Sequence, residues 1–244
     1  MKRKAIFLLI LSAIFAGCAF TQPGRPACLS GRQVVYQSAP LVRFSGGSYA
    51  GTLSFRELKT YGNFGIGTVN GLDGEMIALD NRFYQIRSDG KVYLIEDETL
   101  TPFATVTRFL PQKQKVLNVR TDYAGLAGIL DSILADKEKV YAIKITGKFN
   151  ALKLRSVPAQ VKPFPRLEEV IKKQEVFEYK DMPGVLVGFR FPENMDGVAF
   201  AGYHFHFISQ DRNAGGHLLD CRIEHVFVEI EEISQLVLNC NSSA

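Results

Sequence analysis

The alternation of apolar and polar positions predicts that the first half of the chain is built mainly of β-strands. Residues 82–86, 91–95 and 104–109 alternate in this way or are rich in strand-forming residues. Asp89-Gly90, which separates the first two segments, is typical of a hairpin turn. We therefore expect these segments to lie in a sheet.

The second half carries longer strand-like segments. Strands are expected over 140–145 and 151–157, with Gly147 near the turn between them. Three further segments are rich in β-branched and aromatic residues, namely 185–191, 198–207 and 217–230. Sheet is thus predicted to predominate in both halves.

Helical spacing is limited to short stretches. The clearest is 122–135, where Asp122 stands near the start and apolar residues recur at helical spacing, namely Leu126, Ile129, Leu130, Ile133 and Leu134. Residues 54–57 have the form of a capping box, and Gly62 can end the following helix in the left-handed conformation. Another short helix is expected over 167–174. The order sheet, helix, sheet occurs twice and predicts an α+β fold in which sheet predominates.

The first 17 residues have the layout of an export signal. A basic start precedes the apolar run 5–15, which is too short for a bilayer span of about 20 residues. Cys18 directly follows Ala-Gly, as in the bacterial lipoprotein processing box, so we expect its lipidation; ordinary cleavage nearby is the alternative. Residues 18–32 then form a polar, Pro- and Gly-containing tether. The expected location is periplasmic or cell-surface, with membrane contact only through the lipid on Cys18.

Composition and charge describe an ordinary folded protein. The 244 residues are 46% hydrophobic and 22% charged, and the length allows a substantial buried core. Removing Lys2, Arg3 and Lys4 leaves 26 basic against 25 acidic residues. A near-neutral chain without a Lys/Arg stripe gives no reason to propose a nucleic-acid partner.

Three cysteines remain beyond Cys18, namely Cys28, Cys221 and Cys240. One disulfide and one free thiol are conceivable in an exported protein, and the sequence does not choose the pair. None of the three has the spacing of a metal site. Cys221 lies in an alternating apolar run and is expected to be a core residue.

The histidines carry the strongest chemical signal. Three of the four lie within 14 positions, and His204 and His206 share one face of the expected strand because side chains alternate. The loop 208–216 can return His217 to the same place. Three imidazoles with an open position are typical of a catalytic zinc site. His225 lies too far along the strand and is interpreted as structural.

Two further passages place polar residues among apolar ones. The Gly-rich stretch 63–76 sets Thr68 and Glu75 in or beside turns, and it lacks the spacing of a phosphate-binding loop. Arg155 alternates with apolar residues in a strand, where an inward-facing charge needs a partner such as a substrate carboxylate. From the residues alone, a solvated turn is favoured for Glu75, and the solvent-exposed face of a sheet is favoured for Arg155.

In this order, these passages resemble the bacterial alpha-acetolactate decarboxylase family. The resemblance runs from about Tyr36 to Glu229. It rests on five segments, namely 64–76, 101–104, 141–149, 155–160 and 202–217. It implies that 33–244 is one such domain, sheet-rich α+β, with two related halves (about 33–150 and 151–244). Each half would have a mixed or antiparallel sheet and a covering helix, and a homodimer is possible.

The resemblance also implies a zinc enzyme that converts 2-acetolactate to acetoin and carbon dioxide. The family's zinc-binding histidines fall on His204, His206 and His217. Its glutamate beside the metal falls on Glu75, its active-site threonine on Thr68 and its active-site arginine on Arg155, as implied by those matches. The family's second glutamate, from a C-terminal segment, has no counterpart that can be carried over. The carboxylates beyond Glu224 are Glu229, Glu231 and Glu232.

The implied substrate has a carboxylate, a tertiary hydroxyl and a ketone on adjacent carbons, so decarboxylation leaves charge that the ketone accepts as an enediolate. Zinc on the hydroxyl and ketone oxygens would stabilise that charge. Arg155 would hold the carboxylate, Glu75 would orient a water or move a proton, and Thr68 would position the substrate. Phe205 or Leu72 could supply apolar walls.

Other functions fit the histidine pattern less well. Cupins usually carry a glutamate four or five residues after the second histidine, where Gln210 and Asp211 stand here. A zinc hydrolase could use the same scaffold. A non-catalytic periplasmic lipoprotein that binds a ligand or metal is the alternative from a different class. Release of carbon dioxide from acetolactate separates the decarboxylase from all three.

Overall fold

The computed structural model describes residues 33–240. The predicted signal (1–17), the tether (18–32), the lipidation site Cys18 and also Cys28 lie outside the described residues. Within 33–240, no helix is both long enough and apolar enough to cross a membrane.

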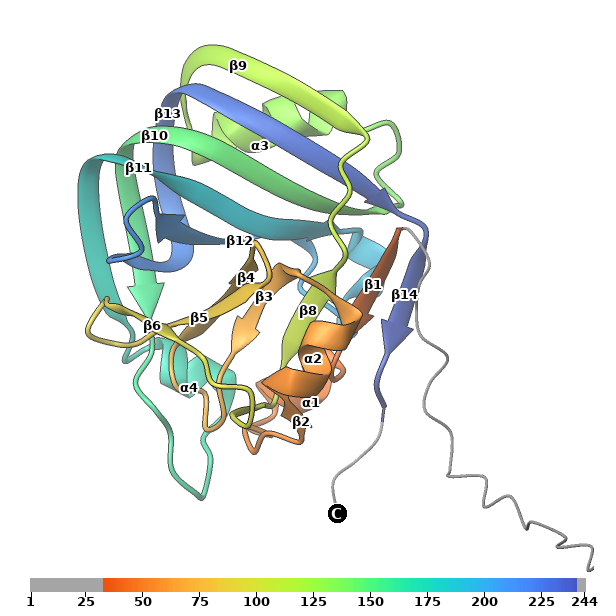
Figure 1. The fold of residues 1–244 in the computed structure, drawn as a ribbon, viewed down its shortest axis with the longest axis vertical. Helices are drawn as coiled ribbons and strands as arrows, with labels where there is room; N and C mark the ends of the chain where they lie inside the picture. The colour runs from red at the N-terminus through yellow and green to blue at the C-terminus, as the bar shows by residue number, and fades with distance from the viewer. Residues whose placement is uncertain (1–32, 241–244) are drawn as a thin grey trace, which may run out of the picture.

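Two β-sheets organise the described chain (Figure 1). The seven-stranded sheet runs in the order β14 (Gln235–Leu238), β1 (Val34–Gln37), β8 (Ala104–Thr107), β3 (Phe64–Thr68), β4 (Glu75–Leu79), β5 (Arg82–Ile86) and β6 (Val92–Leu94). The five-stranded sheet contains β10 (Val140–Ser156), β11 (Glu175–Phe191), β12 (Gly202–Ser209), β13 (Gly215–Ile233) and β9 (Lys113–Asp122), and β10 also pairs with β13. The sheet-rich α+β class is confirmed.

The helices are short; α2, α3 and α4 begin where the sequence predicts, whereas α1 and η1 were not predicted. They are α1 (Leu41–Ser45), α2 (Phe55–Tyr61), α3 (Tyr123–Ile133), α4 (Leu167–Ile171) and the 3₁₀ turn η1 (Glu193–Met195). The Ser54 hydroxyl accepts the Glu57 N–H at 3.2 Å, and the Asp122 carboxylate accepts the Gly125 N–H at 2.9 Å. β2 (Leu53–Ser54), directly before α2, forms a small sheet with β7 (Leu100–Thr101). The amino ends of α2 and α3 are therefore capped by side chains.

Gly62 ends α2, but not in the left-handed conformation that we expected. Its φ of −169° is extended, which any residue can adopt. A Cβ at this position would lie 2.6 Å from the carbonyl oxygen of Thr107. Close approach of the backbone of β8, and not a special dihedral angle, therefore explains the glycine.

Two predicted strands around Gly147 are one continuous strand, β10. Gly147 does not turn the chain, because it is paired with Gly184 of β11 on one side and Val226 of β13 on the other. A register shift between Lys148 and Phe149 allows the long strand to bend. The expected boundary between residues 150 and 151 falls inside this strand, because both neighbouring strands pair with it on either side of that point.

The two faces of β12 serve two different cores. Phe205 and Phe207 pack with Leu126 and Leu130 of α3, which lies against the five-stranded sheet (Figure 1). Ile208, on the other face, belongs to the core between the two sheets. Since side chains alternate along a strand, His204 and His206 face the seven-stranded sheet with Ile208.

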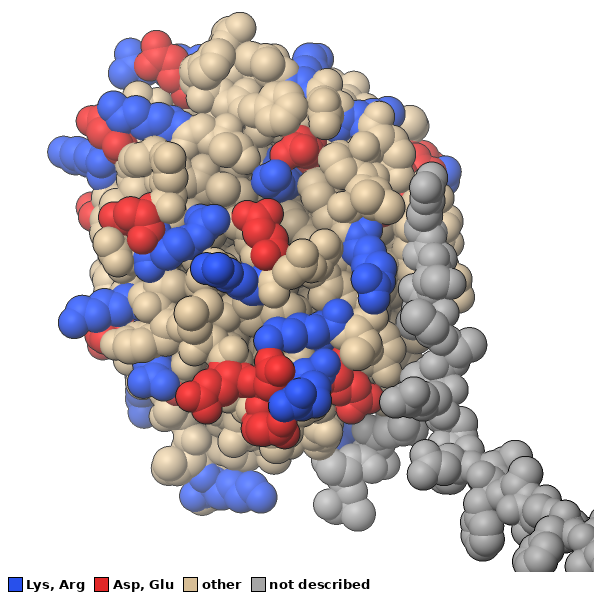
Figure 2. All heavy atoms as spheres, in the orientation of Figure 1, with Lys and Arg blue, Asp and Glu red and all other residues tan. Residues whose placement is uncertain are grey.

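The surface carries charges of both signs. Basic and acidic side chains are intermingled on the face seen in Figure 2. Cys221 is buried in the core beside α3, as predicted, whereas Cys240 is exposed; among the described residues both are free thiols.

Candidate functional site

Three histidines converge between the two sheets. His204 and His206 lie on one face of β12, and His217 at the start of β13 is directly opposite His206 in the strand register. The ring centroids are 4.8 to 5.3 Å apart. One ligand nitrogen from each ring lies within 4.8 Å of the others, so the three can converge on one ion. His225, as expected, is elsewhere on β13, where it bonds to Asn118 of β9.

The hydrogen bonds of His206 fix which nitrogen faces the cavity. Its Nδ1 is 2.9 Å from the carbonyl oxygen of Met76, and because a carbonyl only accepts, Nδ1 must carry the proton. Burial lowers the pKa of His206 to about 3, so the ring is neutral near pH 7. Its Nε2 then holds a lone pair, and it is buried without a hydrogen-bond donor among the described residues.

Glu75 lies beside that lone pair. Its Oε2 is 3.3 Å from Nε2 of His206, and its Oε1 accepts from Nη1 of Arg155 at 2.7 Å. Burial raises the pKa of the carboxyl, and the Arg155 guanidinium only partly offsets this. Two lone-pair atoms at 3.3 Å repel each other unless a proton or a cation stands between them. A proton on Glu75 or a cation bound by His206 would relieve this repulsion.

The donor set fits a metal such as zinc. Burial also lowers the pKa of His204 and His217 well below the ordinary value, so all three rings offer neutral nitrogens. The bond from His206 to Met76 holds its ring in the ligating tautomer, as outer hydrogen bonds do in metal sites. Neutral imidazoles with a nearby carboxylate are the ligands that zinc prefers.

Arg155 reaches the site from the end of β10. The strand pairs Arg155 with His217 of β13, and the next residue, Ser156, donates its hydroxyl to the carbonyl oxygen of Ile86 in β5 at 2.8 Å. This bond ties the five-stranded sheet to the seven-stranded one beside Glu75. A guanidinium has five N–H donors, so the bond to Glu75 leaves others for a substrate carboxylate.

Thr68 lies across from Glu75 in the β3–β4 pair. Its hydroxyl donates to the carbonyl oxygen of Gly74 at 2.6 Å, and the residue is buried. Since the hydroxyl proton is used there, the oxygen is free to accept a hydrogen bond from a ligand. Gly74, whose φ is +76°, makes the tight turn that permits this contact.

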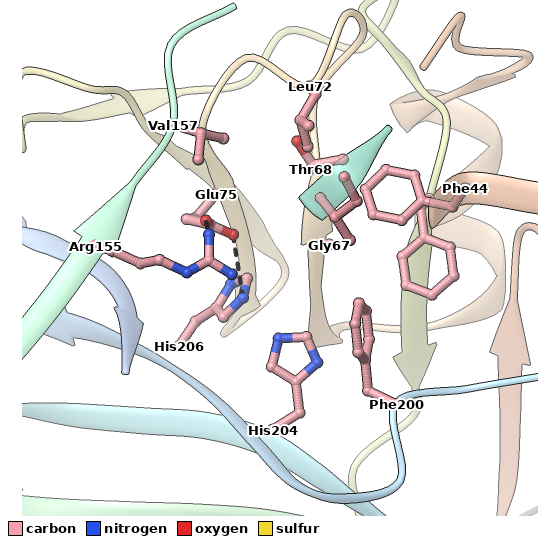
Figure 3. A pocket seen from close by; sticks show the side chains of 12 residues that line it. Phe44, Gly67, Thr68, Leu72, Glu75, Arg155, Val157, Phe200, His204 and His206 are labelled. Atoms are coloured by element: carbon pink, nitrogen blue, oxygen red, sulfur yellow. Dashed lines mark hydrogen bonds and ion pairs between the residues drawn. The ribbon is translucent and has the colours of Figure 1, made fainter. Parts of the chain in front are cut away.

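Thr68, Glu75, Arg155, His204 and His206 line one cavity (Figure 3), and His217 adjoins it through the histidine cluster. In this view Arg155, Glu75 and His206 lie on one side, His204 lies in the middle and aromatic rings lie on the other. The apolar lining consists of Phe44, Leu72, Phe103, Val157, Leu167 and Phe200. Leu72 was expected there, whereas Phe205 points the other way, into the core beside α3, because it alternates with the histidines. The structure thus brings together all six predicted site residues.

The aromatic lining residues were not predicted from the sequence. Phe103 and Phe200 each lie close in sequence to a motif already singled out, at 101–104 and 202–217. Proximity to those motifs was the available signal, and it does not distinguish cavity from core.

The three glutamates beyond Glu224 do not belong to the site. Glu229 pairs with Lys144, and Glu232 pairs with Lys139. Glu231 is buried elsewhere and accepts the N–H of Leu110. Among the residues that line the cavity, Glu75 is the carboxylate.

Comparisons with known proteins agree with this picture. A family model described as alpha-acetolactate decarboxylase matches residues 35–244. An alpha-acetolactate decarboxylase of Methanosarcina mazei is 45% identical over 191 residues, covering 78% of this chain and 66% of the relative. That of Methylococcus capsulatus is 43% identical over 201 residues, covering 82% and 77%. The crystal structure of alpha-acetolactate decarboxylase from Bacillus subtilis strain 168 superposes with a TM-score of 0.84 at 34% identity, covering 86% of this chain and 90% of that one.

Proposed function

The chain belongs to the alpha-acetolactate decarboxylase family, and we propose that it converts 2-acetolactate to acetoin and carbon dioxide with zinc held by His204, His206 and His217. The observation that carries this proposal is the buried, unpartnered Nε2 of His206, which faces Glu75 across 3.3 Å. A cation would accept that lone pair, and the other two imidazoles, whose ligand atoms lie within 4.8 Å, would complete its ligands. When bound, zinc would stabilise as a Lewis acid the negative charge that decarboxylation leaves on the substrate.

The polar side of the cavity would bind and orient the substrate. Arg155 holds the carboxylate through the donors that Glu75 does not use, and charge-assisted bonds of this kind are strong in a buried site. Thr68 accepts a hydrogen bond from the tertiary hydroxyl, since its own proton is bound to Gly74. The two contacts fix the carbon that loses carbon dioxide beside Glu75.

Glu75 is suited to the proton transfer that completes acetoin. Burial raises the pKa of its carboxyl, which makes the carboxylate a stronger base than an exposed glutamate. Its Oε2 is 3.3 Å from Nε2 of His206, whereas its Oε1 is held by Arg155. Arg155 therefore fixes the carboxyl while one oxygen remains available.

The test is acetoin formation from racemic 2-acetolactate by residues 19–244, with zinc content measured on the same sample. The wild-type chain should turn over in proportion to its zinc. His206→Ala should lose both, since removal of even an outer-shell partner typically weakens metal binding 10–100-fold. His225→Ala is the matched control, because this exposed histidine lies outside the cluster and should leave both unchanged. Stoichiometric zinc without acetoin would contradict the proposed reaction.

We further propose that the enzyme is exported and held at a membrane by lipid on Cys18. The support is the order of basic, apolar and Ala-Gly-Cys residues in 1–18. Cys18→Ala should move the protein from the membrane fraction to the soluble fraction and abolish labelling by a fatty acid. Membrane retention of this variant would contradict the lipid anchor.

A further inference from the structure

The turn that leads into Glu75 has two successive carbonyl groups, and a side chain holds each of them. The carbonyl oxygen of Gly74 accepts from the Thr68 hydroxyl at 2.6 Å, and that of Asp73 accepts from Nε2 of Gln85 at 2.7 Å. The same Nε2 donates to Oδ2 of Asp73 at 2.8 Å. Thr68 lines the cavity, whereas Gln85 of β5 is not among the lining residues. Gln85 is thus a second side chain that fixes this turn.

The bonds of Gln85 require an amide. Both oxygens of Asp73 only accept, so they must face the amide nitrogen, and each takes one of its two hydrogens. The amide oxygen, Oε1, accepts from Nε of Arg87 at 3.2 Å, and a guanidinium only donates. Gln85 is buried, so water does not replace these partners. Neither a glutamate nor a methionine could make all three bonds.

The turn depends on outside bonds because it contains a glycine. Gly74 has a φ of +76°, and a glycine can leave this conformation for others at little cost. Gln85 holds the peptide group between Asp73 and Gly74 at its carbonyl oxygen, and the N–H of Gly74 binds the carbonyl oxygen of Leu72 at 3.1 Å. Glu75 follows directly. Rotation of this peptide group would therefore displace Glu75.

Gln85 acts from the face of the seven-stranded sheet that is turned away from the cavity. Its partner across the β4–β5 pair is Met76, and side chains of such partners share a face. The Met76 side chain belongs to the core beyond the sheet, whereas its neighbour Ile77 belongs to the core between the two sheets. An effect of Gln85 on the reaction must therefore pass through the turn.

We propose that Gln85 is a positioning residue, which fixes the turn before Glu75 and so holds the Glu75 carboxyl between Arg155 and His206 (Figure 3). This inference rests on the proposed decarboxylase function and deepens it. Arg87 orients the amide of Gln85, and its own guanidinium lies over the ring of Tyr93 at 4.6 Å.

Substrate binding should depend less on Gln85 than the chemical step does. The Thr68 N–H binds the carbonyl oxygen of Phe103 at 3.0 Å, which anchors Thr68 independently of the turn. Arg155 is anchored on β10. Loss of Gln85 should therefore lower kcat and leave KM nearly unchanged.

The experiment measures kcat and KM for 2-acetolactate in Gln85→Met, made both in the wild-type chain and in Glu75→Gln. In the wild-type chain, kcat should fall roughly 10- to 100-fold, since a misplacement of about 1 Å costs up to about 10²-fold. Zinc content should not change, because the histidine cluster lies on β12 and β13. In Glu75→Gln, the same change should cause no further fall, because the two residues act as one unit.

Thr107→Val is the matched control. It also removes a hydrogen bond of a buried side chain in the seven-stranded sheet, that of the Thr107 hydroxyl to the carbonyl oxygen of Val34 at 2.8 Å. Its melting temperature should fall, as that of Gln85→Met should, whereas its kcat should not change. Gln85→Asn, which keeps the amide on a side chain one carbon shorter, is the second variant. It is judged by the same criteria if Gln85→Met does not fold.

The outcomes are distinguishable. Wild-type protein that forms no acetoin would overturn the proposed function and this role with it. Acetoin formation with equal kcat in the wild type and the folded Gln85 variant would overturn the role of Gln85 alone. An equal loss of kcat with and without Glu75→Gln would also overturn it, since the effect would not pass through Glu75. So would the same loss of kcat in Thr107→Val, which would trace the effect to stability.

Discussion

Glu75 and Glu231 are both buried carboxyl groups whose pKa is raised by burial, yet they lie in different surroundings. Glu75 faces a cavity with Arg155 at 2.7 Å and the lone pair of His206 at 3.3 Å. Glu231 is packed among backbone groups and is bound by the N–H groups of Leu110 and Gln33. Burial alone therefore does not mark a functional carboxyl in this molecule. What distinguishes Glu75, the carboxyl proposed to transfer a proton, is the cavity beside it, the neighbouring Arg155 cation and the unpaired nitrogen of His206.

The largest effect that would sharpen this contrast is expected from Glu75→Gln. The amide keeps the shape and can still accept from Arg155, but it cannot transfer a proton. Turnover should fall by roughly 10²–10⁴-fold, the usual contribution of a positioned acid or base. Single-turnover acetoin formation measures this, with the melting temperature as the folding control. Turnover within threefold of wild type would remove Glu75 from the proton transfer.

Arg155→Ala tests the cationic neighbour of Glu75, a kind of partner that Glu231 does not have among residues 33–240. Turnover should fall by about 10²–10³-fold, as when one preorganised donor to a developing anion is lost. Zinc should remain bound, because Arg155 is not among the clustered histidines. The variant should also lose stability, since Glu75 is left buried without its partner. Arg155→Lys is the matched variant that keeps the charge; normal kinetics in Arg155→Ala would contradict the assignment.

Glu231→Gln should alter stability and leave turnover alone. The folded-state pKa is raised from 4.5 to about 7. Between these values the folded state binds more protons than the unfolded state, so wild-type stability falls as pH rises through this window, by roughly 3 kcal/mol. The variant should lack this fall and be the more stable protein at pH 8. Urea unfolding at pH 5 and pH 8 measures the difference, and parallel pH dependence in both proteins would refute it.

The smallest effect is expected from loss of the hydrogen bond between Ser156 and Ile86, which joins the two sheets beside Glu75. Ser156→Ala removes the hydroxyl that binds Ile86 across the two sheets. A buried hydrogen bond of this kind contributes about 1 kcal/mol. We expect that loss in thermal unfolding and a several-fold reduction in kcat, since Arg155 is next in the chain. A change in stability alone would show that the bond supports only the fold.

Local patterns along the chain predicted much of the fold. Both side-chain caps and the opposed faces of β12 follow from the sequence, because they depend on residues a few positions apart. β9 was not predicted, since its Lys- and Arg-containing sequence is mostly exposed at a sheet edge and lacks a buried alternating face. The sequence did not predict that β10 is one continuous strand. Its neighbours β11 and β13, which are distant in sequence, pair with it across Gly147 and override the preference of glycine for a turn.

Some residues of the candidate site could likewise be predicted from local sequence patterns, and others could not. The histidine pair is visible from strand alternation, and the partners of Glu75 and Arg155 become meaningful only through the family resemblance or the structure. Sequence spacing cannot show that residues 80 positions apart form an ion pair. Nor can it show which phenylalanines line a cavity, because cavity and core residues share the same chemistry.

The parallel pairing of β1 with β14 has a consequence for folding. It joins segments about 200 residues apart, as the bond between Ser234 and Gln33 also does. Contacts of such high sequence separation form late and slow the folding of sheet proteins. Until β14 arrives, the outer edge of β1 stays unpaired and open to intermolecular strand addition. A chain that is synthesised from its amino end therefore completes this sheet only after β14 has been made, so β1 must wait for about 200 residues before it gains this partner.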